Sequence, residues 1–273
     1  MHAKKKIKPY EIISCKKGHS VGVRKSLCFY NPAEVYDSIL NNEDVTKWLN
    51  FISNHYLPPP NKRVLLIYPC SSEKPYFESR SYKTLYKTLN ALGEKRKDVH
   101  LMTISEPFGL VPEEFYGKKT KWHDWKDGWY DCPGLFEWWC NKHGQAYSKE
   151  HVDKSIELLA MHVADFLKKV KSKKSYAKII AFVRTYTSKL KSKHDHTHKR
   201  IIRKAAEIAN IDVAILPDRA IVSEIVENKG RMAWDMYGVS HPMAQEYLLK
   251  YLEGVLKEKW YTKLKRLFYG LLS

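Results

Sequence analysis

An unbroken apolar run from Val64 to Tyr68 is the feature that most constrains the fold of this chain. A strand with apolar residues at every position is buried on both faces, which is typical of a parallel sheet covered by helices. Similar short runs occur at residues 99–104, 177–183 and 212–216, with helical segments between them. The sequence therefore predicts an α/β fold, in which helices cover both sides of a short parallel sheet of about four strands.

Capping and periodicity predict where the helices begin. Asn31-Pro32-Ala33-Glu34 indicates a helix start with Asn31 as the cap, and a second helix is expected from Asp44. Ser148 is expected to cap a long helix that ends near Lys171, because apolar residues recur along it at spacings of three and four. Two further helices are expected over residues 83–93 and 197–210. Another is expected to begin at Ser240 as its cap, and a basic helix is expected from Glu258 to Leu271.

We expect three regions along the chain. Residues 1–60 form a basic segment and a helical extension that ends at the stiff Pro58–Pro60 linker. Residues 61–256 form the α/β core domain, and residues 257–273 a basic amphipathic helix. Within the core, the chain from Ser105 to Gly144 is expected to be loop-like, and its tryptophan-rich insert covers residues 113–144.

The charge of the chain favours an anionic partner. Lys and Arg outnumber Asp and Glu by 48 to 30, a formal net charge of +18. Nucleic acid is the default partner for such a surface, and an anionic membrane surface is the rival. Lysine-rich composition also occurs in proteins from hot environments, and a solvated face explains any single basic run. Candidate nucleic-acid-binding residues lie in one basic loop and the helix after it: Lys191, Lys193, Lys199, Arg200 and Arg203.

The cysteine and histidine pattern predicts a reducing compartment and no bound metal. Five cysteines at irregular spacing form no CxxC pair, which favours the cytoplasm over a disulfide framework. We expect no signal peptide, and no apolar run reaches the roughly 18 residues of a membrane span. His194, His196 and His198 resemble a metal cluster, but the lysines around them favour a polar, basic loop. Cys15, His19 and Cys28 lack the fourth ligand of a zinc knuckle.

The loop after the first strand is the best candidate for a functional site. Pro69 ends the strand, and ligands of open α/β sheets bind beyond the carboxyl ends of the strands. Cys70 is either a nucleophile or covalent anchor, or a small packing residue. Lys74 is either a phosphate or carboxylate ligand or a solvated lysine. The polar residues of this loop are Cys70, Ser71, Ser72, Lys74, Tyr76 and Ser79.

Two further segments place chemistry near this loop. The second strand ends in Ser105-Glu106-Pro107, and a rigid turn is expected up to Pro112. Glu106 is either a general base or hydrogen-bonding group, or the partner of a nearby lysine. Downstream, Tyr130 and Asp131 place an aromatic face beside a carboxylate, an arrangement that can hold an extruded base.

These segments resemble the central domain of archaeosine synthase, an archaeal tRNA-modifying relative of tRNA-guanine transglycosylase. The family pattern is Pro-Cys, three residues, Lys-Pro-Tyr, two residues, Ser, two residues, His. Pro69, Cys70, Lys74, Pro75, Tyr76 and Ser79 match it, and Tyr82 stands in place of the histidine. The segments 105–112 and 130–133 resemble the family's second and third signatures. The resemblance covers roughly residues 42–250.

The resemblance implies a uracil-DNA glycosylase-like fold and a tRNA-modifying activity. We expect no metal or cofactor. In the family, lysine adds to the nitrile of 7-cyano-7-deazaguanine in tRNA, and a radical SAM partner completes the conversion to archaeosine. We expect no PUA domain after residue 250, so a separate RNA-binding subunit is a possible partner. The alternatives are a non-catalytic nucleic-acid-binding protein of the same fold and a base-excising glycosylase.

The resemblance and the loop chemistry together assign roles to residues. The catalytic candidates are Cys70, Lys74, Tyr76, Ser79 and Glu106, and thiol chemistry makes Cys70 a candidate for a thioimidate with the nitrile. The substrate-binding candidates are Pro69, Ser71, Ser72, Pro75, Tyr82, Ser105, Gly109, Tyr130 and Asp131.

Overall fold

The computed structural model describes residues 25–71, 76–116, 119–120, 123–126, 130–191 and 196–269, and the side chains at 119–120, 123–126 and 258–269 are not described. Its centre is a five-stranded sheet in the order β3-β2-β1-β6-β7. The four parallel strands are β1 (Val64–Pro69), β2 (Val99–Ser105), β6 (Lys178–Phe182) and β7 (Ala214–Leu216). All four were predicted from their apolar runs, and the α/β fold class is confirmed.

The fifth strand corrects the sequence analysis. β3 (Gly109–Pro112) runs antiparallel to β2, pairing Ser105 with Gly109 and Met102 with Pro112. Residues 105–144 were expected to be loop-like, and this expectation is wrong. They also contain η6 (Glu113–Phe115), a small second sheet of β4 (Lys119–Thr120) and β5 (His123–Lys126), and α5 (Glu137–His143).

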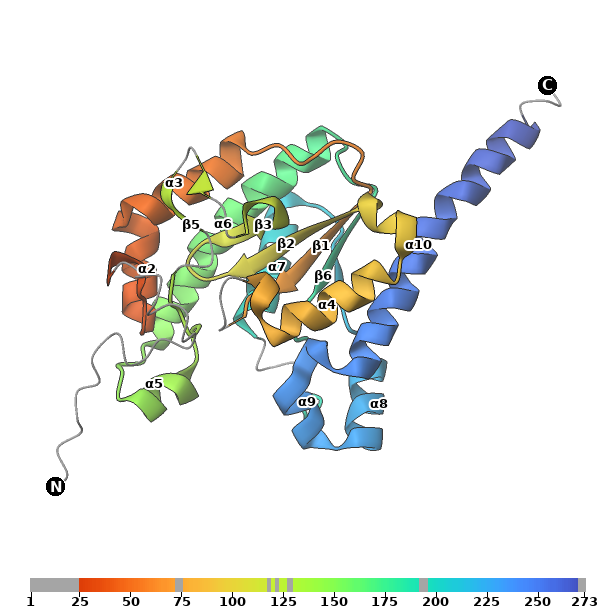
Figure 1. Ribbon diagram of the computed structural model, residues 1–273. Coiled ribbons are helices and arrows are strands. Elements are labelled where there is room, and N and C mark those ends of the chain that lie inside the picture. Colours follow the sequence, from red (N-terminus) through yellow and green to blue (C-terminus); the bar gives the residue numbers. More distant parts are fainter. Residues whose placement is uncertain are drawn as a thin grey trace.

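Helices lie in front of the sheet and behind it (Figure 1). In that view α4 (Arg80–Asn90) and α10 (Pro242–Tyr269) lie in front, and α6 (Lys149–Ser172) and α7 (Thr197–Ala209) lie behind. The layer order of a glycosylase-like fold stays a prediction. The other helical elements are η2 (Lys25–Leu27), α2 (Pro32–Asn41), α3 (Glu43–Asn50), η3 (Phe51–His55), η4 (Tyr76–Glu78), η5 (Gly93–Asp98), α8 (Arg219–Lys229), α9 (Arg231–Tyr237) and η7 (Gly238–Ser240).

The helix starts show which capping predictions hold. Asn31 and Ser148 accept hydrogen bonds from Glu34 N and His151 N, as predicted for N-caps. Ser240 does not cap the last long helix. Its Oγ lies 3.2 Å from Tyr68 Oη, and the ring of His241 accepts from Met243 N instead. The two helices expected from Ser240 and Glu258 form the single helix α10.

The buried core includes the sheet and the N-terminal helices. Every side chain from Val64 to Tyr68 is at most 1% exposed, as expected for a strand covered on both faces. Trp48 of α3 is fully buried, and its Nε1 donates to Phe108 O at 3.1 Å and Leu110 O at 3.2 Å. These bonds fix α3 against the connection between β2 and β3. None of the described helices has the length and hydrophobicity to cross a membrane.

Candidate active site

A cavity of about 440 Å³ opens at the carboxyl edge of the parallel strands. Its walls include Cys70 after β1, Glu106 after β2 and Arg184 after β6. The chain leaves β1 toward β2 on one side and later places β6 on the other side of β1. Such a switch point is where open α/β sheets bind ligands. The volume lies in the range of small-molecule sites, about 300–1,000 Å³.

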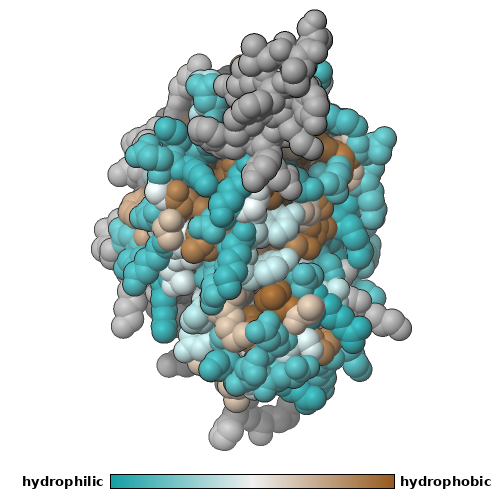
Figure 2. Space-filling view, turned by 90° about the vertical axis from the view of Figure 1, so that its right-hand side faces the viewer, coloured by the Kyte–Doolittle hydropathy of each residue, from teal (hydrophilic) through white to brown (hydrophobic). Residues whose placement is uncertain are grey.

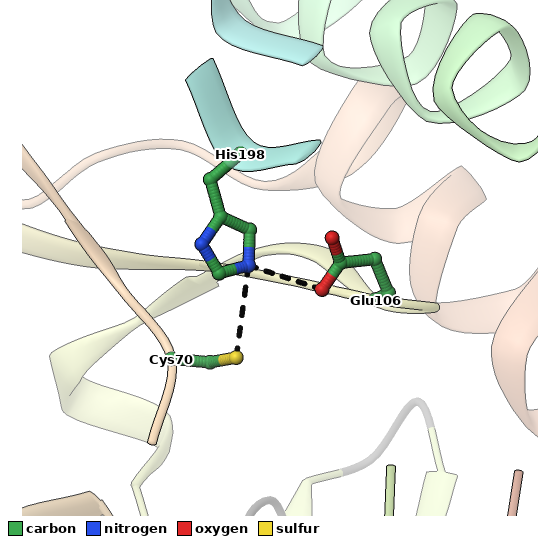
Figure 3. A group of neighbouring side chains, drawn as sticks. All are labelled: Cys70, Glu106 and His198. Atoms are coloured by element: carbon green, nitrogen blue, oxygen red, sulfur yellow. Dashed lines mark hydrogen bonds and ion pairs between the residues drawn. The ribbon is translucent and has the colours of Figure 1, made fainter. Parts of the chain in front are cut away.

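Three side chains that line this cavity come from distant parts of the sequence and lie close together (Figure 3). The imidazole Nε2 of His198 lies 3.7 Å from Cys70 Sγ and 3.0 Å from Glu106 Oε2. Both contacts use the same nitrogen, so His198 lies between the thiol and the carboxylate. Glu106 also accepts a hydrogen bond of 2.5 Å from Thr197 Oγ1, which fixes the second carboxylate oxygen.

The electrostatics of this group favour charged forms of the histidine and the glutamate. Burial alone would lower the pKa of His198, but the carboxylate of Glu106 and the thiol of Cys70 raise it to about 10. Burial alone would raise the pKa of Glu106, but the charge of His198 and the hydrogen bonds from His198 and Thr197 lower it to about 2. The pair is thus an imidazolium and a carboxylate at neutral pH.

A second imidazole lies beside the first. The rings of His196 and His198 are 5.2 Å apart, and the ring of Phe136 contacts His196 edge-on. Burial and the charge of His198 lower the pKa of His196 to about 3, so this ring is neutral. His196 therefore adds an uncharged polar ring to the cavity wall.

Several predicted site residues instead form a buried hydroxyl network beneath Cys70. Tyr130 Oη bonds to Tyr76 Oη and to Ser105 Oγ. Tyr82 Oη bonds to Thr103 Oγ1 and donates to Pro69 O at 3.2 Å, one residue before Cys70. These phenols are at most 2% exposed and do not line the cavity. Their position indicates that they support the loop that carries the thiol.

The other predicted site residues are distributed as follows. Pro69, Cys70 and Glu106 line the cavity. Ser79 is the N-cap of α4 and accepts from Tyr82 N, Gly109 begins the edge strand β3, and Asp131 is buried with its backbone bonded to Leu27 and Phe29. Ser71 is partly exposed and does not line the cavity. Ser72, Lys74 and Pro75 lie outside the described residues.

The predicted nucleic-acid-binding residues are only partly available. Arg200 lies 2.6 Å from Asp153, Arg203 lies 3.9 Å from Glu207, and Lys199 Nζ donates to Thr185 O. Lys191 is exposed, and Lys193 lies outside the described residues. From the α10 side, hydrophilic side chains cover most of the surface and hydrophobic ones lie between them in small groups (Figure 2).

The sequence analysis missed His198, His196 and Arg184. His194, His196 and His198 were expected to lie in a polar, basic loop, which is wrong for His198, because this side chain is buried at the first turn of α7. One signal was available. This segment follows the carboxyl end of a predicted parallel strand, as Cys70 and Glu106 do, so it reaches the same edge of the sheet.

The same three side chains could also hold a metal ion. One ligand atom each from Cys70, Glu106 and His198 lies within 4.8 Å of the others. Sulfur, nitrogen and oxygen are ligands that zinc accepts, with an open fourth position at catalytic sites. The ion pair between His198 and Glu106 accounts for the arrangement without a metal.

Comparison with known proteins supports the resemblance. A family model described as "Domain of unknown function (DUF5591)" matches residues 45–122, which include β1, the Cys70 loop and β2. Archaeosine synthase subunit alpha of Thermococcus kodakarensis is 37% identical over 83 residues, 30% of this chain and 14% of that protein. The subunit of Thermoplasma acidophilum is 33% identical over 103 residues, 37% of this chain and 18% of that protein.

Archaeosine synthase of Methanocaldococcus jannaschii is 30% identical over 134 residues, 49% of this chain and 19% of that protein. The resemblance to archaeosine synthases is thus confirmed over up to half of this chain, which spans less than a fifth of each of these three relatives. Among solved structures, that of AF0587, a protein of unknown function, covers 66% of this chain and 48% of that chain at 18% identity. Its TM-score of 0.36 is too low to establish a shared fold.

Proposed function

We propose that this chain acts in tRNA modification in the archaeosine pathway, and that it adds an amine to the nitrile of 7-cyano-7-deazaguanine in tRNA. The observation that carries the proposal is the position of Cys70. This cysteine of the family motif lines a cavity and lies 3.7 Å from the charged imidazole of His198. A nucleophile and a proton donor are the two groups that addition to a nitrile requires.

In the first step, the thiolate of Cys70 attacks the nitrile carbon. A carbon–sulfur bond forms, and one pair of π electrons of the nitrile moves to its nitrogen. His198 Nε2 gives its proton to this nitrogen, so the product is a neutral thioimidate bound to Cys70. Glu106 forms no bond to the substrate. Its Oε2 lies 3.0 Å from His198 Nε2, and its charge keeps the imidazole protonated before the step.

In the second step, a neutral amine attacks the thioimidate carbon. A carbon–nitrogen bond forms, the carbon–sulfur bond breaks, and Cys70 leaves as a thiolate. The excess proton of the amine returns to His198 Nε2, which restores the starting state. The product is an amidine, which contains all atoms of the nitrile and the amine. Lysine is the proposed amine, as the family resemblance implies, and Lys74 stays a candidate ligand for the substrate.

The substrate is proposed to be tRNA because the chain is strongly basic. Its formal net charge of +18 fits a polyanion, and the cavity has aromatic walls that include Phe136, Trp138 and Trp139. Aromatic faces hold a base that has left its stack. Completion by a radical SAM partner, a separate RNA-binding subunit and a cytoplasmic location are further parts of this proposal.

Two measurements test the proposal. Free 7-cyano-7-deazaguanine should raise the intact mass of the protein by the mass of the whole base, since thioimidate formation releases nothing. Cys70→Ala should abolish the mass increase, and Cys140→Ala should keep it, because Cys140 is buried in a separate cluster with Tyr30 and Trp139. An adduct that survives in Cys70→Ala would refute the role of this thiol.

The second measurement uses tRNA that carries the nitrile base, with lysine and the radical SAM partner supplied. Digestion to nucleosides should show a lysine adduct or its product, and Cys70→Ala should not form it. If neither the lysine adduct nor its product forms with the parent chain, a non-catalytic binding protein is the better hypothesis. Release of a free base from damaged DNA would favour the glycosylase.

A further inference from the structure

A second cavity of about 470 Å³ adjoins the first. The two cavities share four wall residues, namely Phe136, Trp138, Arg184 and His196. The remaining wall of the second cavity is mostly polar and includes Thr185, Thr187 and Asp235. The mechanism above uses none of these polar groups.

Arg184 is fixed in place at the boundary between the two cavities. Its Nη2 donates to Trp234 O at 2.9 Å and Asp235 O at 2.8 Å, and its guanidinium lies 5.6 Å from the centre of the Trp234 ring. Gly238, with φ of +51°, permits this position, because a Cβ there would lie 2.7 Å from Arg184 Nη2. The guanidinium is therefore held in position before any ligand binds.

The Nη1 atom of this guanidinium faces the carboxylate of Asp235 at a distance that leaves both groups able to bind a ligand. Arg184 Nη1 lies 4.0 Å from Asp235 Oδ1, which is beyond hydrogen-bond length. Within the described part of the chain, Nη1 makes no hydrogen bond. The Arg184 side chain is 30% exposed and that of Asp235 is 52% exposed, so solvent or a ligand can reach both.

We propose that the second cavity binds the head group of a free α-amino acid, with Arg184 on its carboxylate and Asp235 on its ammonium. The side chain of the amino acid would pass the shared wall, so that a terminal amine reaches the cavity of Cys70. The inference rests on the proposed function, in which an amine reacts there. An adjacent cation and anion match a zwitterion, whereas the Asp235 carboxylate repels a phosphate.

The test measures binding to the full chain without tRNA by isothermal titration calorimetry. L-lysine should bind, and cadaverine, which lacks the carboxylate, should bind about 10- to 100-fold more weakly, the effect of losing a hydrogen bond to a charged group. The same loss is expected for 6-aminohexanoate, which lacks the α-ammonium. Arg184→Gln, Asp235→Asn and Gly238→Ala should each weaken lysine binding to a similar degree.

Arg219→Gln is the matched control, because Arg219 is exposed on α8 and lines neither cavity. It should bind lysine as the parent chain does. Asp235→Asn tests the site even if Arg184→Gln unfolds, since the Asp235 side chain is half exposed. Equal affinity for cadaverine and lysine, unchanged binding in Asp235→Asn, or binding of a nucleoside monophosphate in place of lysine would each overturn the inference.

The experiments distinguish failure of this amino acid site from failure of the proposed function. Lysine binding with these variant effects supports the amino acid site even if no adduct forms on tRNA. Formation of the lysine adduct at full rate by Asp235→Asn and Arg184→Gln would overturn the site and leave the role of Cys70 intact.

Discussion

Replacement of Glu106 by Gln tests the electrostatic basis of the candidate active site. The change keeps the size of the side chain and removes its charge, 3.0 Å from the nearly fully buried imidazole of His198. The carboxylate helps to raise the pKa of His198 from 6.5 to about 10. Without it, burial dominates, so the pKa of His198 should fall below 6.5. Breaking a buried ion pair from one side costs about 3–5 kcal/mol of folding free energy.

The sign of the effect follows from both partners. The folded-state pKa of His198 is raised, so its contribution to stability is complete below pH 6.5 and is lost as the pH rises toward 10. The folded-state pKa of Glu106 is lowered, so its contribution is complete above pH 4.5 and is lost as the pH falls toward 2. The difference in unfolding free energy between the parent chain and Glu106→Gln should therefore be largest between pH 4.5 and 6.5.

Two assays measure this effect. Urea unfolding at about pH 5.5, 7.5 and 9.5 should show a difference that shrinks as the pH rises. Proton NMR of the histidine rings should show one resonance that titrates far above pH 6.5, is absent in His198→Gln, and moves below 6.5 in Glu106→Gln. Thr197→Val is the control, since it removes one hydrogen bond to Glu106 and keeps the ion pair. A His198 resonance that titrates near 6.5 in the parent chain would refute the reasoning.

Three further predictions concern single features of the fold and the site. Tyr82→Phe should lower the free energy of unfolding by about 1–3 kcal/mol, because it removes two hydrogen bonds, to Pro69 O and Thr103 Oγ1. It should keep the Cys70 adduct in the intact-mass assay, because Tyr82 does not line the cavity. Zinc should slow the alkylation of Cys70 by iodoacetamide, because thiol, imidazole and carboxylate ligands meet there, and a chelator should restore the rate. His198→Gln should remove the effect of zinc on this rate. An unaltered alkylation rate in zinc would argue against a metal site. Trp48→Ala should lower the unfolding free energy in urea by about 3–5 kcal/mol because Trp48 is fully buried, whereas Trp138→Ala, at a residue that is 63% exposed, should change it by less than about 0.5 kcal/mol.

The sequence predicted the centre of the fold because the signal there is local. Each parallel strand is a short apolar run, and this run alone is enough to predict a strand that is buried on both faces. The edge strand β3 was missed because it has only the four residues Gly109–Pro112, and antiparallel pairing with β2 is a tertiary property. Helices α8 and α9 were also missed, although Ile221, Val222, Ile225 and Val226 of α8 recur at helical spacing and pack on the core.

The candidate site was predicted only in part because one of its three groups is remote in sequence. Cys70 and Glu106 follow predicted strands directly, so the topology alone brings them to one edge of the sheet. His198 lies 128 residues beyond Cys70, within a run of lysines and histidines that is typical of a solvated loop. Its burial depends on how α7 packs on α6, which residue spacing along the chain does not reveal.

The hydroxyl network under the loop explains why a motif alone overstates a site. Tyr76, Ser79 and Tyr82 fall within the motif, but the structure places them behind Cys70, where they hold the loop and cap α4. A family motif retains residues that contact the substrate together with residues that position them. The exchange of the family histidine for Tyr82 therefore alters the support beneath Pro69, and it leaves the imidazole of His198 beside the thiol, where the proposed addition would need a proton.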